Sequence, residues 1–461
     1  MPVWATPVAL ATLACFELVA LDHGVYRTQK LLALLLVGSL VVMLVCLFFA
    51  LRRPASRIVA VRRRRATAIL IVVLAISTLV HAVMAVPELV QVQRYTNDAV
   101  TVTDCAARQV LQGGNPYKNA HTLQCLARPG LGFGATTPLQ AGNFWQLHSY
   151  PSSSNGLFRW LQWKTFTNEL QREVRNPSYL SPDFEGRFNY PGAAIAVAIP
   201  ALVLGFRDLV PLYLIFIVAA CVAIWRRADP RIRPVVGLLL LGNTAFITDG
   251  FGGLTDATYV MLLVFYWLNR ERPLLAGLLL GLAAASRQQA WFFVPFLLYL
   301  GWRTYGWGDL WRRGGIMAAV FLGFNLQFIL MSPGDWLTGV LGPMHDPLFA
   351  LGVGLVELST AKILPLWSMT VYGALGIVAF AAAFVYFTRR WQSSPALAMF
   401  LPVLPLVFAW RSLHSYFMFL PLLAVTALVT LYRPVEDSTP VELTDHDPAP
   451  RPRSAFRVVA P

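Results

Sequence analysis

Long apolar runs separated by short polar connections recur along most of the chain. Many approach the roughly 17–25 residues that a helix needs to span the hydrocarbon core of a bilayer. The pattern therefore predicts an all-α polytopic membrane protein with about 12–13 transmembrane helices. The expected spans are residues 7–21, 31–51, 67–86, 209–225, 234–248, 254–268, 273–285, 290–302, 315–331, 364–387, 396–410 and 413–431, with a shorter apolar segment at residues 190–206.

Basic residues cluster in several of the short connections. The densest cluster runs from Arg62 to Arg65, and others occupy residues 226–233, 270–272, 303–313 and 389–390. Short loops rich in Lys and Arg stay on the cytoplasmic side of a membrane. We therefore expect all of these connections, and the N-terminus, to be cytoplasmic.

One apolar segment breaks this alternation of sides. With every basic connection inside, residues 190–206 cannot cross the membrane completely. The segment is short and contains Pro200, so we predict that it is re-entrant or crosses halfway. Irregular segments at membrane depth are tolerated where they line a cavity. The alternative is a full crossing that leaves one basic connection outside.

This topology divides the chain into three parts. Residues 1–66 form two N-terminal transmembrane helices and a basic cytoplasmic loop. Residues 67–432 form the main transmembrane module, with a long extracytoplasmic loop at residues 87–189, and loops of this length are usually functional. The tail, residues 433–461, is rich in proline and charge, and we expect it to be disordered and cytoplasmic.

Two helices are expected inside the long loop. The first spans residues 98–112 and ends at Gly113, since glycine commonly terminates helices and Pro116 prevents this one from resuming. The second lies near residues 157–174, where Trp and Leu at helical spacing alternate with Arg and Lys. This composition is typical of a helix in the membrane interface, although an ordinary packed loop helix fits it too.

Composition agrees with a membrane protein. Of the 461 residues, 57% are hydrophobic and 13% are charged, which is too little charge to cover a soluble protein of this length. The net charge of +14 follows from the basic cytoplasmic connections. It therefore requires no nucleic-acid partner.

The cysteines divide between the membrane and the long loop. Cys15, Cys46 and Cys221 lie in apolar spans, where they are expected to be inert. Cys105 and Cys125 share the long loop, and an extracytoplasmic position would let them form a disulfide. Their spacing alone does not decide whether they do.

The assignment of sides collects many polar residues at the outer ends of the spans. Only the basic connections were used to assign the sides, so this collection is an independent observation. Ionisable residues at such positions are costly and usually mark a site. The collected residues are Asp98, Asp104, Arg187, Tyr190, Asp249, Asp256, Arg287, Gln288, Gln289, His345, Asp346, Arg411 and His414.

Several of these residues also have a purely structural interpretation. Asp256 lies close to several glycines and would shape a turn or cap the next helix. Arg287 would reach toward lipid headgroups, and His414 would be a satisfied interfacial histidine. Asp104 is on another face of the helix that begins with Asp98, where it would simply be solvated.

The chemistry on offer is that of carboxylates and arginines at a membrane surface. The chain shows no thiol–histidine pattern, no Gly-rich phosphate loop opening a helix and no zinc-ligand spacing, so neither a metal nor a cofactor is expected. Arginine matches phosphate oxygens with its planar fork. A positioned carboxylate can take the proton of an attacking hydroxyl, which is worth on the order of 10²–10⁴ in rate. A lipid-phosphate donor would suit such a site.

Several short motifs follow the third expected span in a fixed order. They are Asp98, Ala106-Ala107, Leu111, residues 113–117 (Gly-Gly-Asn-Pro-Tyr), residues 188–191 (Phe-Asn-Tyr-Pro), residues 286–293 and residues 411–416. In this order they resemble the GT-C superfamily of integral membrane glycosyltransferases. The closest likeness is to the polyprenyl-phosphate-mannose-dependent mannosyltransferases of a family-87-like group that builds cell-envelope glycolipids. The resemblance covers about residues 67–432.

The resemblance implies a GT-C-like fold with a large extracytoplasmic first catalytic loop. It also implies transfer of a sugar from a polyprenyl-phosphate donor to an envelope glycolipid or glycan acceptor by a single inverting displacement. The likeness favours mannose, and arabinose or another pentose stays open. Asp98 matches the catalytic aspartate of the family and would be the general base, with Asp104 as the alternative. The chain departs from the family at Gly192, where the Tyr-Pro motif would continue with a second proline.

The remaining candidates follow from their side of the membrane and their chemistry. Arg287, Arg411 and His414 would bind the donor phosphate. The other candidate substrate-binding residues are Tyr117, Arg187, Tyr190, Asp256 and Gln288. The partners would be membrane lipid, the donor and the acceptor, and the protein would be a multi-pass cell-membrane enzyme with an extracytoplasmic active site.

Two other classes of function stay open. A transporter or flippase of a lipid-linked sugar would also need many spans and intramembrane charges, although the chain shows no internal repeat of the kind that many transporters have. A scaffold in an envelope-assembly complex is the third interpretation, which no specific motif favours.

Overall fold

The computed structural model describes residues 4–24, 30–52, 69, 72–73, 75–76, 79, 95, 98–127, 156–243, 253–346, 348 and 350–431. The expected third span at residues 67–86 lies largely outside the described residues. The basic run at residues 62–65 and Asp249 lie wholly outside them. The expected disordered tail at residues 433–461 lies outside them as well.

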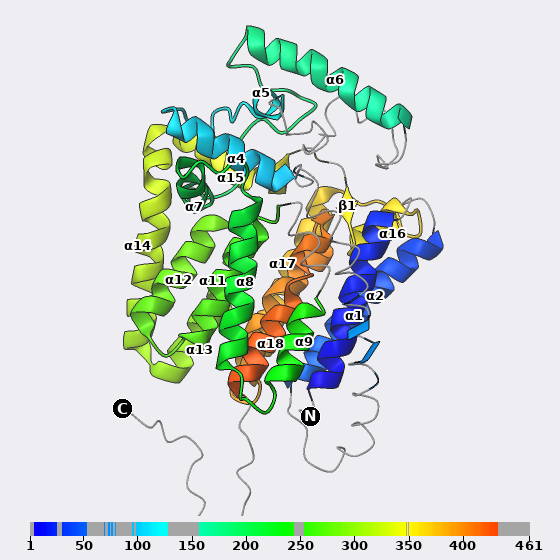
Figure 1. The fold of residues 1–461 in the computed structure, drawn as a ribbon, viewed down its shortest axis with the longest axis vertical. Coiled ribbons are helices and arrows are strands. Elements are labelled where there is room, and N and C mark those ends of the chain that lie inside the picture. The colour runs from blue at the N-terminus through cyan, green and yellow to red at the C-terminus, as the bar shows by residue number, and fades with distance from the viewer. Residues whose placement is uncertain are drawn as a thin grey trace, which may run out of the picture.

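The core of the molecule is a bundle of apolar helices that run side by side (Figure 1). Five helical segments are long and apolar enough to cross a membrane: four single helices and residues 414–431. The all-α membrane architecture expected from the sequence is confirmed at this level. The bundle helices are α1 (Ala5–Gly24), α2 (Lys30–Arg52), α8 (Val210–Arg227), α9 (Arg233–Leu241), α11 (Asp256–Leu268), α12 (Pro273–Ser286), α13 (Gln289–Tyr305), α14 (Trp307–Met331), α17 (Met369–Arg390) and α18 (Leu420–Leu431).

The basic residues gather at one end of this bundle, here called the basic end. Arg313 donates a hydrogen bond to the carbonyl of Arg270 at 3.0 Å, which joins the α13–α14 and α11–α12 connections. The hydroxyl of Ser394 donates to the carbonyl of Arg52 at 2.5 Å, which joins α2 to the segment after α17. The helices that finish here carry arginines in their last turns, where cations are favourable: Arg52, Arg226, Arg227, Arg303, Arg389 and Arg390.

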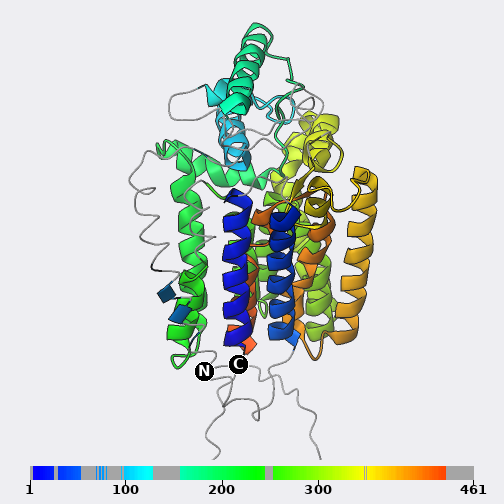
Figure 2. The ribbon, with the colours of Figure 1, turned by 90° about the vertical axis from the view of Figure 1, so that its right-hand side faces the viewer.

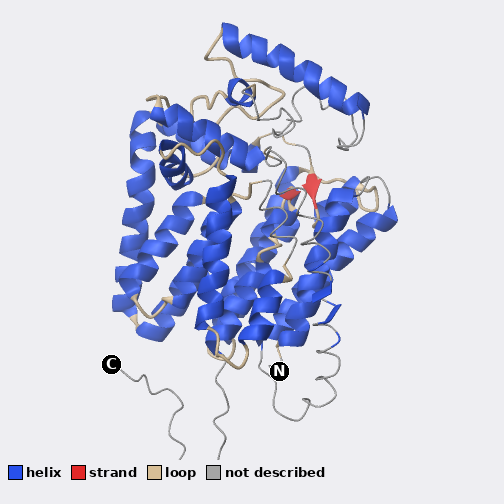
Figure 3. Cartoon of the chain, in the orientation of Figure 1, coloured by secondary structure: helices blue, strands red, loops and turns tan. Residues whose placement is uncertain are grey.

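The opposite end, here called the cap end, is covered by short helices that lie across the bundle (Figures 1 and 2). In the described part, two short strands pair in parallel there, with Leu351 opposite Arg411 (Figure 3). The elements of the cap end are α4 (Asp98–Leu111), α5 (Thr122–Leu126), α6 (Gly156–Arg175), α7 (Ala193–Val203), α15 (Pro333–His345), α16 (Leu355–Thr360), β1 (Leu351–Gly352) and β2 (Arg411–Ser412).

Both helices expected in the long loop are present as α4 and α6. Cys105 on α4 and Cys125 on α5 form a disulfide, which closes the question that spacing left open and ties the two helices together. α6 is the outermost element of the cap (Figure 1). Its inner face packs on the loops beside it, where Glu173 pairs with His121 at 3.0 Å. The expected interfacial role of α6 stays a prediction, since the side chains of residues 156–162 lie outside those described.

The segment at residues 190–206 does not form a full crossing. α7 has 11 residues, or roughly 16 Å at the rise of an α-helix, and it lies across the cap end (Figure 2). Its start is fixed by Gly192, whose N–H donates to the side-chain oxygen of Asn325 at 2.8 Å. A Cβ on Gly192 would lie 2.2 Å from the carbonyl oxygen of Phe324. This close contact with α14 explains why the chain has glycine where the family likeness expects a second proline.

One expected span is wrong as a regular helix. Residues 396–410 fold into two 3-10 helices, η3 (Pro395–Met399) and η4 (Leu401–Phe408). Pro402 and Pro405 lack the N–H groups that an α-helix would use, and the tighter 3-10 turns tolerate their loss over a short distance. The apolar pattern predicted burial correctly, since most of this segment is buried, but it did not predict the helix type.

Candidate functional site

Arg287 lies in the break between α12 and α13, at the cap end. Its backbone is extended, which interrupts the helical path between α12 and α13, and the residue is only 3% exposed. One guanidinium nitrogen, Nη2, lies 3.0 Å from a carboxylate oxygen of Asp256 and donates to the hydroxyl of Thr255 at 2.5 Å. The guanidinium carbon lies 3.8 Å from the ring centroid of Tyr190, a cation–π contact.

Two of the N–H-bearing nitrogens of Arg287 remain open. Nε and Nη1 are buried and have no hydrogen-bond acceptor among the described residues. Buried donors on a charged group are costly when they stay unsatisfied. An anionic group with several acceptor oxygens, such as a phosphate, would satisfy both.

Asp98 is the first residue of α4 and is partly buried. No hydrogen bond or ion pair joins its carboxylate to another described residue, and its charge acts on Asp256, Tyr190 and Tyr416. Asp256 and Tyr190 are also the contacts of Arg287. The structure therefore places an uncommitted carboxylate and an incompletely satisfied guanidinium around the same side chains.

Asp104, the alternative base, is buried, and both of its carboxylate oxygens accept hydrogen bonds. It is completely buried, and its two oxygens accept hydrogen bonds from the hydroxyl of Tyr95 at 2.8 Å and from Nε of Arg108 at 2.6 Å. Tyr95 in turn accepts from the N–H of Leu209 at 2.9 Å. Burial, followed by the charge of Asp104, raises the pKa of Tyr95 well above its usual range. These bonds fasten α4 to the start of α8, so Asp104 has a structural role.

Glu185 is a site residue that the sequence did not single out. It is 8% exposed, and burial, followed by the charge of Asp346, raises the pKa of its carboxyl to about 7. Asp98 adds to this shift, while the charge of Arg411 opposes it. Glu185 lies in an irregular loop without helical or strand periodicity. The sequence offers only its proximity to Arg187 and the Phe-Asn-Tyr-Pro motif as a signal.

Two further arginines border this region. Arg187 is partly buried, and its Nε has no hydrogen-bond partner among the described residues. Arg411 is partly buried in β2, where the pairing with β1 fixes its backbone. No ion pair to Arg411 joins it to a described residue, although its charge acts on Glu185 and Tyr416.

His414 has a partner that the sequence did not suggest. Its Nδ1 lies 2.5 Å from a carboxylate oxygen of Asp22, near the end of α1. The ring is held by a carboxylate from the N-terminal helix, and the expected role of His414 in binding the donor phosphate stays a prediction. Asp22 follows the first expected span, and no pattern within the sequence links it to residue 414.

Three of the expected substrate-binding residues contact the residues around Tyr190 and Arg287, and their expected role stays a prediction. The hydroxyl of Tyr117 donates to the carbonyl of Tyr190 at 2.8 Å, and its buried ring packs against Phe188. The side-chain amide of Gln288 donates to the carbonyls of Asn189 and Val340 at 2.5 and 2.8 Å. Asp256 is the ion-pair partner of Arg287. Asp256 therefore contacts the cation directly, while Tyr117 and Gln288 bond the backbone at Tyr190 and beside it.

The described residues include no group of three or more His, Cys, Asp or Glu that could hold a metal ion. The side chain of His345, like Asp249, lies outside those described. The arrangement brings a guanidinium with two nitrogens that lack an acceptor, and a carboxylate without a bond to a described residue, to the same pair of side chains, Asp256 and Tyr190. Comparison of the chain with known protein families, curated proteins and solved structures finds no match.

Proposed function

We propose that this protein is a membrane-embedded glycosyltransferase that moves a sugar from a polyprenyl-phosphate donor to an envelope glycolipid or glycan acceptor at the cap end. The observation that carries the proposal is that Arg287, with two nitrogens that lack an acceptor, and Asp98, bonded to no described residue, both act on Asp256 and Tyr190. The cap end lies opposite the basic connections, which positive-inside bias assigns to the cytoplasm. The site would then be extracytoplasmic.

Arg287 would anchor the donor phosphate. Its open nitrogens fit two phosphate oxygens, and Asp256 and the Tyr190 ring keep the fork in one orientation. Arg187 and Arg411 would supply further positive charge as the phosphate leaves. The polyprenyl tail would lie against the exposed apolar faces of the bundle helices. With this arrangement the phosphate stays at the membrane surface while its lipid remains in the bilayer.

Asp98 would act on the acceptor. An acceptor hydroxyl oxygen attacks the anomeric carbon of the donor sugar, and the bond from that carbon to the phosphate oxygen breaks with its electron pair going to the phosphate. The hydroxyl proton passes to the Asp98 carboxylate. A single displacement of this kind inverts the anomeric configuration, and its general base contributes on the order of 10²–10⁴ in rate.

Separate measurement of donor binding and turnover tests these roles. With purified protein and labelled polyprenyl-phosphate mannose, Asp98→Asn should lower transfer at least about 100-fold while donor binding is retained. Arg287→Gln should weaken donor binding itself. Asp335→Asn, which removes a carboxylate at the start of α15, should change neither and serves as the control. Full transfer by Asp98→Asn would remove Asp98 from the mechanism.

The same preparation separates a transferase from a transporter or flippase of a lipid-linked sugar. In sealed proteoliposomes, a transferase forms a new glycosidic bond to the acceptor. A transporter moves the labelled donor across the membrane without forming one. Movement without a new bond would overturn the proposal.

A further inference from the structure

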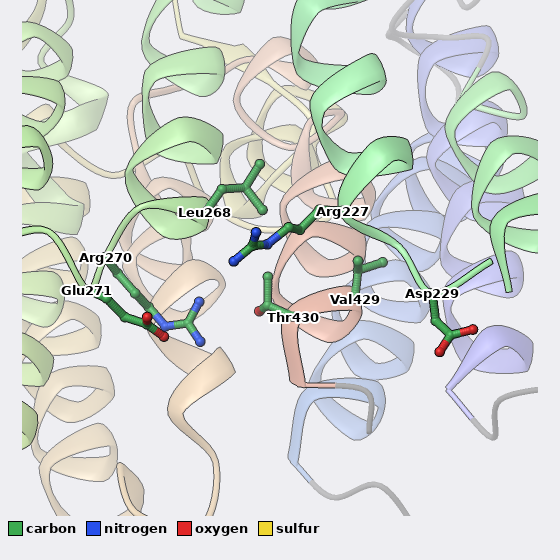
Figure 4. A pocket seen from close by; sticks show the side chains of 7 residues that line it. All are labelled: Arg227, Asp229, Leu268, Arg270, Glu271, Val429 and Thr430. Atoms are coloured by element: carbon green, nitrogen blue, oxygen red, sulfur yellow. The ribbon is translucent and has the colours of Figure 1, made fainter. Parts of the chain in front are cut away.

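A polar cavity opens at the basic end, at the far side of the bundle from the proposed active site. It has a volume of about 310 Å³, and it is formed by the connections after α8 and α11 together with the end of α18 (Figure 4). Its lining residues are Arg227, Asp229, Leu268, Arg270, Glu271, Val429 and Thr430.

Two arginines point into this cavity. In Figure 4 the guanidinium groups of Arg227 and Arg270 are directed toward each other and toward Thr430, while the carboxylate of Asp229 is turned away. Arg270 is held in place by a hydrogen bond to the carbonyl of Trp267 at 3.0 Å and by the Trp267 ring, whose centroid is 4.9 Å away. No hydrogen bond or ion pair joins the guanidinium of Arg227 to another residue in the described chain. Glu271 also lines the cavity, and its charge acts on Arg270, as does the like charge of Arg227. An anion between the two arginines would stabilise Arg227 as well, which has no such carboxylate bonded to it among the described residues.

A second cavity adjoins the first. It also measures about 310 Å³, shares Arg227 and Leu268 with the first cavity, and lies between α8 and α11. Ala223 and Phe265 add apolar surface, and Arg226 and Asn269 complete the lining. The lining thus changes from strongly polar beside Thr430 to partly apolar between the two helices. An amphiphile, with a polar headgroup and an apolar chain, matches this change.

We propose that these two cavities form a binding site for an anionic phospholipid of the cytoplasmic leaflet. Its phosphate would lie between Arg227 and Arg270, and its glycerol and the first part of an acyl chain would occupy the space beside Phe265. Basic pockets between transmembrane helices at the cytoplasmic surface favour such headgroups. The site lies opposite the proposed active site and uses none of its residues, so it is independent of the proposed function.

Native mass spectrometry of the detergent-purified full-length protein tests the site. The probes are phosphatidylglycerol, phosphatidylcholine with the same acyl chains, and glycerol 3-phosphate as the soluble phosphate. The wild type should bind phosphatidylglycerol in preference to both others. Arg227→Gln should lower phosphatidylglycerol affinity about fivefold, the effect of one basic residue near an anionic lipid. Arg227→Lys, which keeps the charge and loses the fork, should lose less.

Arg390→Gln is the matched control, because it removes an exposed arginine from the same end and lines neither cavity. It should bind phosphatidylglycerol as the wild type does. Equal loss in Arg227→Gln and Arg390→Gln would reduce the effect to overall charge and overturn the proposal. Equal binding of phosphatidylglycerol and phosphatidylcholine would overturn it as well. Binding of glycerol 3-phosphate as tight as that of the lipid would show a site for a free phosphate instead. Arg227 is exposed and bonded to no described residue, so its variants are expected to fold.

Discussion

Two carboxylates on one helix, Asp98 and Asp104, have opposite surroundings. Asp104 is buried and bonded through both oxygens to Tyr95 and Arg108, whereas Asp98 is partly exposed and bonded to no described residue. A catalytic base must be free to contact its substrate. Removal of one partner of a buried ion pair leaves an uncompensated charge and strongly destabilises the folded protein. At the residue scale this difference favours Asp98 over Asp104 as the proposed base and gives Asp104 a role in holding α4 in place.

Substitution of these two residues should therefore affect different properties. Asp104→Asn should lower the free energy of unfolding by about 2 kcal/mol or more, since it leaves Arg108 without its ion-pair partner. Asp98→Asn should change stability by less than about 1 kcal/mol. Thermal unfolding of both variants in the same detergent measures this difference. Equal destabilisation by both variants would contradict the assignment.

The raised pKa of Glu185 predicts that the stability of the protein depends on pH. Burial raises its pKa from the usual 4.5 to about 7 in the folded protein, so between these two pH values the folded state binds more protons than the unfolded state. Stability should fall as pH rises through this window, by at most about 1.4 kcal/mol per pH unit. Unfolding temperatures between pH 5 and pH 8 measure the slope, and Glu185→Gln should flatten it. An unchanged slope in Glu185→Gln would show that another group titrates.

At the scale of elements, Gly192 allows the start of α7 to pack closely against α14. Its N–H bonds Asn325 of α14, and the carbonyl of Phe324 occupies the place where a Cβ would be. α7 follows directly after Tyr190, the ring beneath Arg287. The position of the cation is therefore coupled to the packing of α7 on α14.

Gly192→Ala should destabilise the protein and lower transfer, because the added Cβ would lie 2.2 Å from a backbone oxygen and force α7 outward. Gly192→Pro should be worse, since it also removes the N–H that bonds Asn325. The control is Gly323→Ala, on α14, the helix that Gly192 contacts. Nothing lies within 4 Å of the Cβ that this substitution adds. Unfolding temperature and transfer rate are the readouts, and a Gly192→Ala variant that matched Gly323→Ala would refute the coupling.

Periodicity predicted the elements better than it predicted the site. Apolar runs located the bundle helices, and Gly113 and Pro116 marked the end of α4 correctly. The predicted α-helical span at residues 396–410 was wrong because an apolar pattern predicts burial and not the type of helix. The prolines of this segment favour the 3-10 helices that are observed. The side assignment brought Arg287, Asp256 and Asp98 to one end. It could not pair His414 with Asp22, nor bring Glu185 to the site, because these contacts join irregular or distant segments whose approach only the folded chain determines.

The whole molecule has two chemically distinct ends. One is the basic end, and the other is the cap end, which carries Asp98, Asp256, Glu185 and Tyr190. This polarity predicts the orientation in the membrane. An impermeant maleimide should label Gln171→Cys on α6 in intact cells. Gln392→Cys, beyond the end of α17, should be labelled only after lysis. Both positions are exposed, and the parent protein gives the background from Cys15, Cys46 and Cys221. The reverse pattern would place the cap end in the cytoplasm.

The most direct test of the central claim is to follow the anomeric carbon of a labelled polyprenyl-phosphate sugar incubated with purified protein and a glycolipid acceptor. We predict label in a new glycosidic bond with inverted configuration, formed by the wild type and lost in Asp98→Asn. A product with retained configuration would contradict a single displacement with one base. Unaltered donor throughout, with folded protein and the acceptor present, would contradict glycosyl transfer itself.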